Sequence, residues 1–368
     1  MIVPGGVDRT GEVRVIPALL ALIERLTRRH DVHVFALRQE PRAATWALCG
    51  ARIYNIGYVA TRLRAIGRVC AQHRATPFDL VQSIWSGAGG LIAVATARIL
   101  RLPSLVHVAG GELVRIPEIG YGGRLRWRGR LQESLVLKGA TVMTAASAGM
   151  LYALDMFGRS AQRVPLGADL RTWVPRTPVR RTLPGAVRLI HVASLNRVKD
   201  QVTLLRALSE LAARHVEFYL ELVGEDTLGG EIQRLAHEWG LAGRIRFHGF
   251  MPQPRVVEIM RTAHINIVSS RHEAGPLVVL EAAAVGVPTV GTAVGHVAEL
   301  SPEAAVAVPI GDWAALADAI VSVAADEELR LRLARNALAC TLREDADYTA
   351  RCFEDLYAHV VAAHPGAV

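Results

Sequence analysis

Short apolar runs alternate with amphipathic runs through most of the chain, and this alternation sets the expected fold. In the first half it predicts strands at 31–37, 79–84 and 104–108 and helices at 16–29 and 63–73. The second half repeats the pattern more regularly. It predicts strands at 187–193, 217–223, 244–247, 265–268, 288–291 and 305–308, and helices at 202–214, 231–238, 255–262 and 276–285. Strands that alternate with helices form βαβ units, so we expect an α/β protein with doubly wound, parallel sheets.

A proline-rich segment separates the two series of elements. Residues 171–186 carry Pro175, Pro178 and Pro184 among basic side chains, which predicts a linker. We therefore place one Rossmann-like domain at 1–172, a linker at 173–186 and a second Rossmann-like domain at 187–345. Residues 328–363 predict a helical end of the chain. Two such domains imply a cleft between them, with ligands beyond the carboxyl ends of the strands.

Composition indicates a globular protein that can build two cores. The chain has 368 residues, of which 51% are hydrophobic. No apolar stretch reaches the roughly 18 to 20 residues that a membrane span needs, and the first residues do not resemble a signal peptide. Four cysteines form no CxxC pair, so we expect a reduced, cytoplasmic protein without structural zinc. Asp345 and Asp347 have the spacing of a metal-binding pair but lie in a charged helical run, which predicts helix surface.

Charge is distributed unevenly between the two halves. Residues 1–180 hold 25 Lys and Arg against 11 Asp and Glu, whereas the remainder holds 17 against 23. A basic first half predicts an anionic partner such as a phospholipid surface, a lipid-diphosphate carrier or an acidic glycan. The alternative is a solvated, arginine-rich surface. Nucleic acid is disfavoured because no helix-turn-helix, zinc or RNP-type pattern accompanies the charge.

Two acidic residues eight positions apart, Glu273 and Glu281, flank the start of an apolar segment. Pro276 suits the first turn of the helix predicted there, and Gly286 suits the position just past its end. Glu281 lies among apolar residues, where a carboxylate costs several kcal/mol unless it is hydrogen-bonded. The hydroxyls of a sugar would satisfy it, and the helix N-terminus suits a phosphate. The pair therefore predicts a sugar-nucleotide site; the alternative is two acids that each pair with an arginine.

Lys199 is the second candidate, because the chain has only two lysines and the other is Lys138. It follows the predicted strand at 187–193 and opens the next helix near Asp200. Its ammonium can therefore reach a diphosphate at the carboxyl edge of the sheet, and Arg197 lies beside it. The alternative is an exposed loop lysine.

Two weaker candidates lie in the first half. Gly5 and Gly6 follow a very short apolar start and precede a helical run, which predicts either a glycine loop under a phosphate or sugar or an ordinary tight turn. His107 lies at the carboxyl end of the strand at 104–108. It is either a hydrogen-bond partner for a sugar or acceptor, or a histidine satisfied in the core.

Trp127 is surrounded by four arginines, Arg124, Arg126, Arg128 and Arg130. They suggest a membrane or anion patch. Helical spacing, however, places Arg126 and Arg130 roughly opposite Arg124 and Arg128. We therefore favour a solvated helix with partial contact to the acceptor.

Together these motifs resemble those of the retaining glycosyltransferases of family 4, which have the GT-B fold. The E-x7-E motif of that family matches Glu273 and Glu281, and its Gly-x-Pro-x-x-x-Thr matches residues 286–292. The likeness covers most of the chain and is tightest from 189 to 300. Further similar segments are the Gly249-Phe250 pair, the strand–lysine–helix segment at 192–200, the end of the first domain at 163–169, and Gly5-Gly6.

The resemblance implies two Rossmann-like domains facing a cleft. It implies that residues 1–172 bind the acceptor, that residues 187–345 bind the sugar nucleotide, and that a C-terminal helix at 346–368 crosses back to the first domain. It further implies a nucleoside diphosphate sugar as donor substrate, no additional cofactor, no metal, and retention of configuration. The acceptor would be a glycan or a lipid-linked sugar. The basic charge of the first half, independently of the resemblance, predicts a peripheral contact with the inner face of a membrane.

The resemblance also implies residue roles. Glu281 would hold the nucleotide ribose, Glu273 would contact the donor sugar, and Lys199 with Arg197 would neutralise the leaving diphosphate. His107 would lie near the donor sugar. The remaining donor-binding positions would be Gly5, Gly6, Phe250, Gly275, Pro276 and Leu277, with the backbone amides near Gly275 and Leu277 facing the diphosphate.

One departure from the family pattern leaves other functions open. The family commonly has Gly-Arg a few residues before the lysine, whereas this chain has Ala193-Ser194. Arg197 is the candidate to replace that arginine, from a different backbone position. The alternatives are a GT-B epimerase that acts on a sugar nucleotide without an acceptor, and a non-catalytic sugar-nucleotide-binding subunit.

Overall fold

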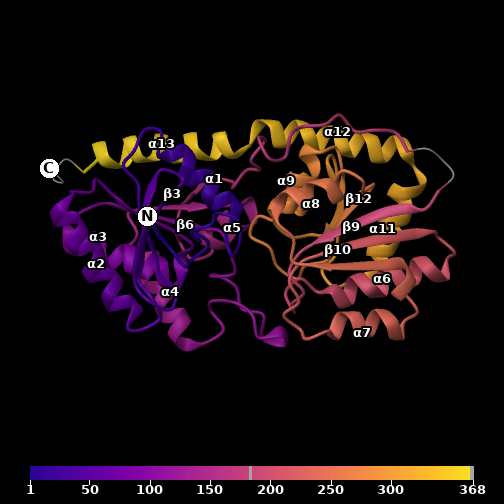
Figure 1. Cartoon of the computed structure of the whole chain (residues 1–368), viewed down its shortest axis with the longest axis horizontal. Helices are drawn as coiled ribbons and strands as arrows, with labels where there is room; N and C mark the ends of the chain where they lie inside the picture. Colours follow the sequence, from indigo (N-terminus) through magenta and orange to yellow (C-terminus); the bar gives the residue numbers. More distant parts are fainter. Residues whose placement is uncertain (182–184, 365–368) are drawn as a thin grey trace. The chain divides into compact units, whose positions relative to one another are not determined.

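The computed structural model describes residues 1–181 and 185–364, and its contacts divide the chain into two compact units. Unit 1 comprises Met1–Gly167 together with Ala346–Val368, and unit 2 comprises Ala168–Asp345. Each unit is a sheet covered by helices, which confirms the predicted α/β class (Figure 1). Within the described ranges every helix is too short or too polar to serve as a membrane span.

Unit 1 is built on a sheet with the order β3-β4-β2-β1-β5-β6-β7-β8. All neighbouring strands are parallel except β3 and β4, which form an antiparallel hairpin. The strands are β1 (Ile2–Val3), β2 (His33–Ala36), β3 (Ala44–Leu48), β4 (Ala51–Asn55), β5 (Val81–Ile84), β6 (Ser104–Val108), β7 (Val142–Ala145) and β8 (Gln162–Arg163). The central strands β2, β5 and β6 are buried along their whole length, as expected of parallel strands covered on both faces.

The helices of unit 1 cover both faces of this sheet. They are α1 (Pro17–Leu26), α2 (Thr61–Ala75), α3 (Leu91–Leu100), α4 (Trp127–Gly139), α5 (Ala148–Asp155) and α13 (Ala346–Ala362), with short helical turns η1 (Ser86–Gly90) and η2 (Pro117–Ile119). Phe353 and Leu356 of α13 are buried in the same cluster as Leu22 and Leu26 of α1. The last helix of the chain is therefore part of the core of unit 1 (Figure 1).

Unit 2 is built on a fully parallel sheet with the order β11-β10-β9-β12-β13-β14. The chain starts at β9 in the middle, proceeds outward to β11, and returns to β12 on the other side of β9. The strand order therefore reverses between β9 and β12. The strands are β9 (Val187–Val192), β10 (Phe218–Val223), β11 (Ile245–Gly249), β12 (Ile265–Val268), β13 (Thr289–Thr292) and β14 (Ala305–Val308).

The helices of unit 2 are α6 (Gln201–Ala213), α7 (Glu231–Glu238), α8 (Gln253–Met260), α9 (Leu277–Ala284), α10 (Gly295–Leu300), α11 (Trp313–Ala325) and α12 (Glu327–Arg343), with the turn η3 (Ala242–Arg244). Side-chain caps begin three of them: Asp200, Asp312 and Asp326 each accept a backbone N–H from the first turn of the following helix. The largest core cluster consists mainly of leucine, isoleucine and valine between the sheet and α6, α7 and α11, and a second cluster packs Trp173 with α8 and α9.

Several elements of the structure were not predicted from the sequence, namely α3, β7, α5, β8, α10 and α11. The hairpin of β3 and β4 was not predicted either, because β3 is an edge strand with few strongly apolar residues. Its turn uses Cys49 and Gly50, both with positive φ. The helical run predicted at 328–363 is two helices. Helix α12 ends before Glu344 and Asp345, and α13 begins after them and belongs to unit 1.

The predicted linker at 173–186 packs onto unit 2. Trp173 is buried against α9, and the N–H of Arg176 donates to the carbonyl of Ala284 at 2.9 Å. An indole and a main-chain hydrogen bond hold this segment in place, so the contacts assign residues 168–181 to unit 2. Residues 182–184, with the predicted Pro184, lie outside the described residues.

The segment is closed by a buried cluster of three charges, Arg181, Glu327 and Arg330. Glu327 accepts hydrogen bonds from the Arg181 Nε at 2.8 Å and from the Arg330 Nη2 at 2.6 Å, and Arg330 also donates to the carbonyl of Val179. Burial alone would raise the pKa of Glu327, but hydrogen bonds from Arg330 and Arg181 outweigh it and hold this pKa at about 2. All three side chains are more than nine-tenths buried.

We predict that Glu327→Ala destabilises unit 2 by about 3–5 kcal/mol, because it leaves two buried guanidinium groups without a counter-charge. The pKa of Glu327 is lowered on folding from 4.5, so its contribution is present above pH 4.5 and is lost as pH falls toward 2. Urea unfolding at pH 7 and pH 4 measures both effects. Glu328→Ala is the matched control: this neighbour pairs with Arg180 in solvent, so no measurable change is expected. Equal losses in the two variants would contradict the assignment.

Candidate functional site

The reversal of strand order in unit 2 places a crevice at the carboxyl ends of β9 and β12. Loops that leave two such strands in opposite directions cannot cover the space between them, which is where doubly wound sheets bind ligands. The loop after β9 is residues 193–200, and the loop after β12 is residues 269–276. These two loops carry Lys199 and Glu273.

Backbone and side-chain hydrogen bonds join these two loops. The N–H of Arg271 donates to the carbonyl of Val198 at 2.8 Å, and the Ser269 hydroxyl donates to the carbonyl of Lys199 at 2.8 Å. The Lys199 ammonium contacts the Glu273 carboxylate, which also accepts the Ser270 hydroxyl at 2.7 Å. The Lys199 and Glu273 side chains are 25% and 14% exposed, so the pair is accessible but largely removed from water.

Local turn chemistry directs Lys199 toward this crevice. The Asn196 Oδ1 accepts the N–H groups of Val198 and Lys199, both at 3.1 Å, and so closes an Asx turn. Asp200 follows with a φ of 49° and caps α6 by accepting the N–H of Thr203. The lysine is thus held between an Asx turn and a helix cap.

Glu281 lies in the middle of α9, which begins just after Pro276. The helix ends at Ala284 with Val285 as its cap, and Gly286 follows with a φ of 80°. The N–H groups of Gly286 and Val287 donate to the carbonyls of Ala283 and Ala282, as in a Schellman motif. Burial raises the pKa of Glu281 to about 7, although the neighbouring side chains of Gln253 and Trp173 oppose that rise. The Gln253 amide donates to the Glu281 Oε1 at 3.3 Å.

The start of α9 directs main-chain donors toward this pair of acids. The first N–H groups of a helix lack partners within it; here they belong to Leu277 and Val278, because Pro276 has no N–H and the N–H of Val279 donates to the carbonyl of Pro276 at 3.1 Å. Gly295 allows the close approach of the neighbouring loop, since a Cβ there would lie 2.6 Å from the Cδ of Pro276. Phe250 is exposed in the loop after β11, three residues before Gln253.

Arg197 does not point where the sequence predicted, and Arg271 is a second cation near Lys199 that the sequence analysis did not identify. Arg197 is exposed and pairs with Glu231 of α7 at 3.0 Å, so it is not directed at the Lys199–Glu273 pair. Arg271 was not predicted; it follows β12 and contacts Asp200 at 3.4 Å, next to Lys199. Its position two residues before Glu273, in the short loop after β12, is the signal that could have identified it.

In unit 1, the glycine loop between β1 and α1 is fixed by Gln39. The Gln39 Oε1 accepts the N–H groups of Gly6 at 2.7 Å and Val7 at 3.0 Å, and its amide donates to the carbonyl of Arg14. The N–H of Gly6 therefore already has a partner inside the protein. This geometry favours a structural turn at Gly5-Gly6 over a phosphate loop formed by the Gly6 amide.

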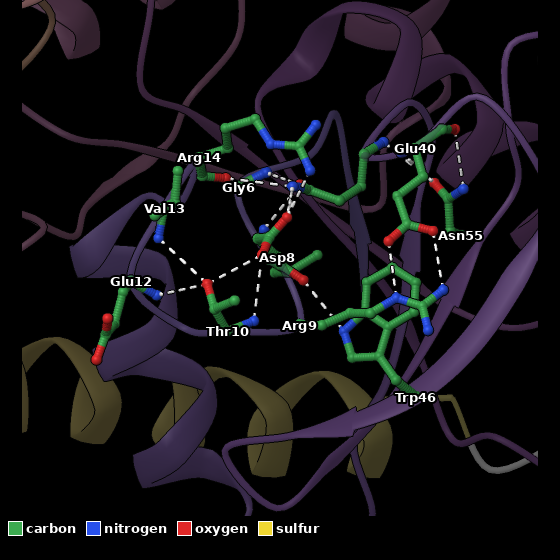
Figure 2. A network of polar contacts seen from close by, with 12 residues as sticks. Gly6, Asp8, Arg9, Thr10, Glu12, Val13, Arg14, Glu40, Trp46 and Asn55 are labelled. Carbon is green, nitrogen blue, oxygen red and sulfur yellow. Dashed lines mark hydrogen bonds and ion pairs between the residues drawn. The ribbon is translucent and has the colours of Figure 1, made fainter. Parts of the chain in front are cut away.

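Asp8 and Glu40 complete this network (Figure 2). The buried Asp8 accepts the N–H and hydroxyl of Thr10 and the Arg14 guanidinium, and these contacts lower its pKa although burial raises it. Arg9 pairs with Glu40 and lies over the Trp46 ring. The loop is thus ordered by side chains of the β2–β3 region.

His107 has no exposed surface. Its Nδ1 is 2.9 Å from the Thr144 hydroxyl, and its ring packs edge-on against Phe353. Burial lowers the pKa of His107 to about 3, so the ring is neutral. The ring lies in the core, as one of the two alternatives had it, but among the described residues its Nε2 has no hydrogen-bond partner, so the histidine is only partly satisfied there.

Two buried acids at the carboxyl edge of the unit 1 sheet escaped the sequence analysis. Glu112 accepts the N–H of Ser86 at 3.1 Å, and Glu133 accepts the Ser86 hydroxyl at 2.9 Å. Burial raises the pKa of Glu112, and it raises that of Glu133 to about 7. The Gly110-Gly111 pair directly after β6 is the signal that could have pointed to Glu112. In the described residues, no group of three or more His, Cys, Asp or Glu is arranged to hold a metal.

Comparison with known proteins agrees with this geometry. A family model described as "Glycosyl transferases group 1" matches residues 183–339, and one described as "Glycosyl transferase 4-like domain" matches residues 15–167. A D-inositol 3-phosphate glycosyltransferase of Frankia alni is 30% identical over 325 residues, which cover 82% of this chain and 78% of the relative. The chain spans about half the length of other curated relatives that it matches, 52% to 57%.

Solved structures share the fold. Sucrose-phosphate synthase from Thermosynechococcus elongatus superposes with a TM-score of 0.82 at 20% identity, over 98% of each chain. The HepE protein of Anabaena, solved in complex with UDP-glucose, superposes with a TM-score of 0.75 at 18% identity, over 97% of this chain and 98% of that one. The chain belongs to the family 4-type glycosyltransferases of GT-B fold.

Proposed function

We propose that this protein is a retaining glycosyltransferase that moves a hexose from a nucleoside diphosphate sugar to a glycan or lipid-linked acceptor. The observation that carries the proposal is the contact of Lys199 with Glu273 at the switch point of unit 2, beside the helix that holds Glu281. A cation, a helix N-terminus and two acids in one crevice match a diphosphate that lies between two sets of hydroxyls.

Each group has a role in the proposed donor complex. Glu281 accepts hydrogen bonds from the ribose hydroxyls, and the exposed ring of Phe250 lies toward the base. The amides at Gly275 and Leu277 face the diphosphate. Lys199 neutralises that diphosphate, and Glu273 accepts hydroxyls of the donor sugar.

The proposed reaction breaks the bond between the sugar C1 and the diphosphate oxygen. The electron pair stays on the diphosphate, where Lys199 and the α9 amides stabilise the developing charge. The acceptor hydroxyl adds to C1 from the same face, and its proton passes to the departing diphosphate oxygen. No protein nucleophile is required, and the configuration at C1 is retained.

Relatives and structural neighbours support a nucleotide-sugar donor. HepE was solved with UDP-glucose, and the Frankia relative is named for a transfer that involves D-inositol 3-phosphate. The positive charge of the first half supports a peripheral contact with an anionic membrane. A UDP-sugar is accordingly the first donor to test.

A non-catalytic sugar-nucleotide-binding subunit is the second candidate. Ala193-Ser194 replaces the Gly-Arg of the family, and Arg197 pairs with Glu231. Arg271 weakens this alternative, because it places a guanidinium beside Lys199 from the neighbouring loop. A thermal-shift screen of UDP-, GDP- and ADP-sugars, followed by assays for nucleotide release and for an epimerised donor, separates transferase, epimerase and binding subunit.

We predict that Lys199→Ala lowers the rate of donor cleavage by about 100- to 1,000-fold, the usual effect of losing one group that stabilises transition-state charge. Release of UDP from UDP-glucose, or from the donor that the screen selects, is the measurement. Lys138→Ala removes the only other lysine and is the matched control, with wild-type cleavage expected. Unchanged cleavage in Lys199→Ala, with the fold intact by circular dichroism, would sink the proposed mechanism.

We predict that affinity for the UDP-sugar rises by about tenfold between pH 6 and pH 8. The carboxylate of Glu281 accepts hydroxyls better than the neutral acid does, and its pKa of about 7 means that its ionised fraction grows across this range. Isothermal titration at the two pH values measures the slope. Glu281→Gln should bind the UDP-sugar weakly, with an affinity that does not change with pH. Glu258→Gln, on the exposed face of α8, should show the same pH dependence of affinity as the wild type. A persistent slope in Glu281→Gln would assign the titration to another group.

A further inference from the structure

The outer face of α4 carries a stripe of large apolar side chains that nothing in unit 1 covers. Trp127, Leu131 and Leu135 are 62%, 54% and 50% exposed. They are four residues apart, so they lie on one face of the helix, one above the other. Single exposed leucines are common on protein surfaces, but a continuous stripe is typical of a contact surface.

The opposite face of α4 is already used. Val136 and Leu137 are buried in unit 1, and Glu133 is fixed by the Ser86 hydroxyl of η1. The helix is therefore apolar on two sides, whereas a helix on the surface of a protein normally exposes a polar face. The outer stripe does not contribute to the core.

Positive charge borders this stripe on both sides. In helical projection, Arg128 and Arg130 flank the apolar side chains, and Lys138 lies at the end of the same face. The arrangement of Arg128 and Arg130 differs from the one predicted from the sequence, in which all four arginines lay on one helix. The helix begins at Trp127, so Arg124 and Arg126 precede it and do not share its periodicity. Between Glu118 and Asp155 the only acidic residue is the buried Glu133.

The beginning of α2 extends the surface. The Arg62 guanidinium donates to the Gln132 Oε1 of α4 at 2.6 Å, which joins the start of α2 to the outer surface of α4. Val59 and Leu63, on either side of Arg62, are 64% and 77% exposed. Residues 41–78 contain no acidic side chain. Apolar and basic groups are thus interleaved over both helices.

We propose that the outer face of α4, with the start of α2, docks on an anionic phospholipid membrane. The apolar stripe enters the boundary between headgroups and acyl chains, where an indole is favoured, and the arginines reach lipid phosphates. Charge complementarity favours a membrane over a protein as the partner of this surface. A protein that covered the stripe would need acidic side chains placed opposite the arginines, whereas any anionic membrane presents negative charge over its whole surface.

The placement of α4 connects this surface to the reaction. The helix follows the long loop that leaves the carboxyl end of β6 and packs on η1, which follows the carboxyl end of β5. In doubly wound sheets this is the edge at which ligands bind. If the proposed function holds, docking of this surface on a membrane would bring the acceptor side of unit 1 to the lipid, so the acceptor would be a sugar or polyol carried by a lipid.

Vesicle flotation of the full chain tests the membrane contact directly. We expect binding to vesicles of phosphatidylglycerol and phosphatidylcholine at low salt, little binding to phosphatidylcholine alone, and release at high salt. Replacing Trp127, Leu131 and Leu135 together with Gln should abolish flotation. Arg128→Gln with Arg130→Gln should weaken it by about 25-fold, since each cation near an anionic surface contributes a factor of about five.

Leu342→Gln on α12 is the matched control, because it removes an exposed helical leucine beside a basic residue in unit 2. It should float like the wild type. Absence of binding at low salt, or equal flotation of the Gln triple variant, overturns the proposal. The proposal is also overturned if the wild type is a dimer in sedimentation velocity and the triple variant is a monomer, because the stripe would then be an interface between two protein chains. Donor cleavage in solution should be unchanged in the triple variant; if the wild type floats but cleaves no donor, the proposed function fails and the membrane contact stands.

Discussion

The junction of two loops at the switch point of unit 2 is the constraint on which the candidate site depends. Lys199 and Glu273 are 74 positions apart, and they meet because β9 and β12 are neighbours and because Ser269 and Arg271 tie the two loops together. An exposed ion pair gains little from such proximity. This one is largely shielded, and its loops are fixed by main-chain hydrogen bonds, so the ammonium and the carboxylate are held in place before any ligand arrives.

The stability of unit 2 and the geometry of the site share the same contacts. Gly286 ends α9 and lets residues 176–178 run against it, while Arg181, Glu327 and Arg330 anchor the continuation of that segment. Trp173 is buried against the same helix that holds Glu281. Loss of the buried charges would therefore loosen the support of α9 before it affected any group in the crevice.

Most of unit 2 could be predicted from the sequence, because its strands are short apolar runs separated by clear helical periods. Unit 1 was harder: the edge strand β3 is half-buried or exposed along its length, whereas its hairpin partner β4 is mostly buried. The local sequence pattern also could not show which distant residues contact the motif residues in the folded protein. Gln39 takes the Gly6 amide, Phe353 covers His107, and Glu231 attracts Arg197, from 33, 246 and 34 positions away. The motif residues were identifiable by type, but their directions depended on strand order and packing.

The two halves of the chain would respond to different solution conditions. Forty of its 42 basic residues are arginines, whose guanidinium groups remain charged at any physiological pH. Contact of unit 1 with anionic lipid would therefore vary with ionic strength and hardly with pH. In the proposed donor complex, binding in unit 2 depends on Glu281, whose pKa burial raises to about 7. Salt would thus control access to a membrane-borne acceptor and pH would control donor loading, so each step can be changed experimentally while the other is held constant.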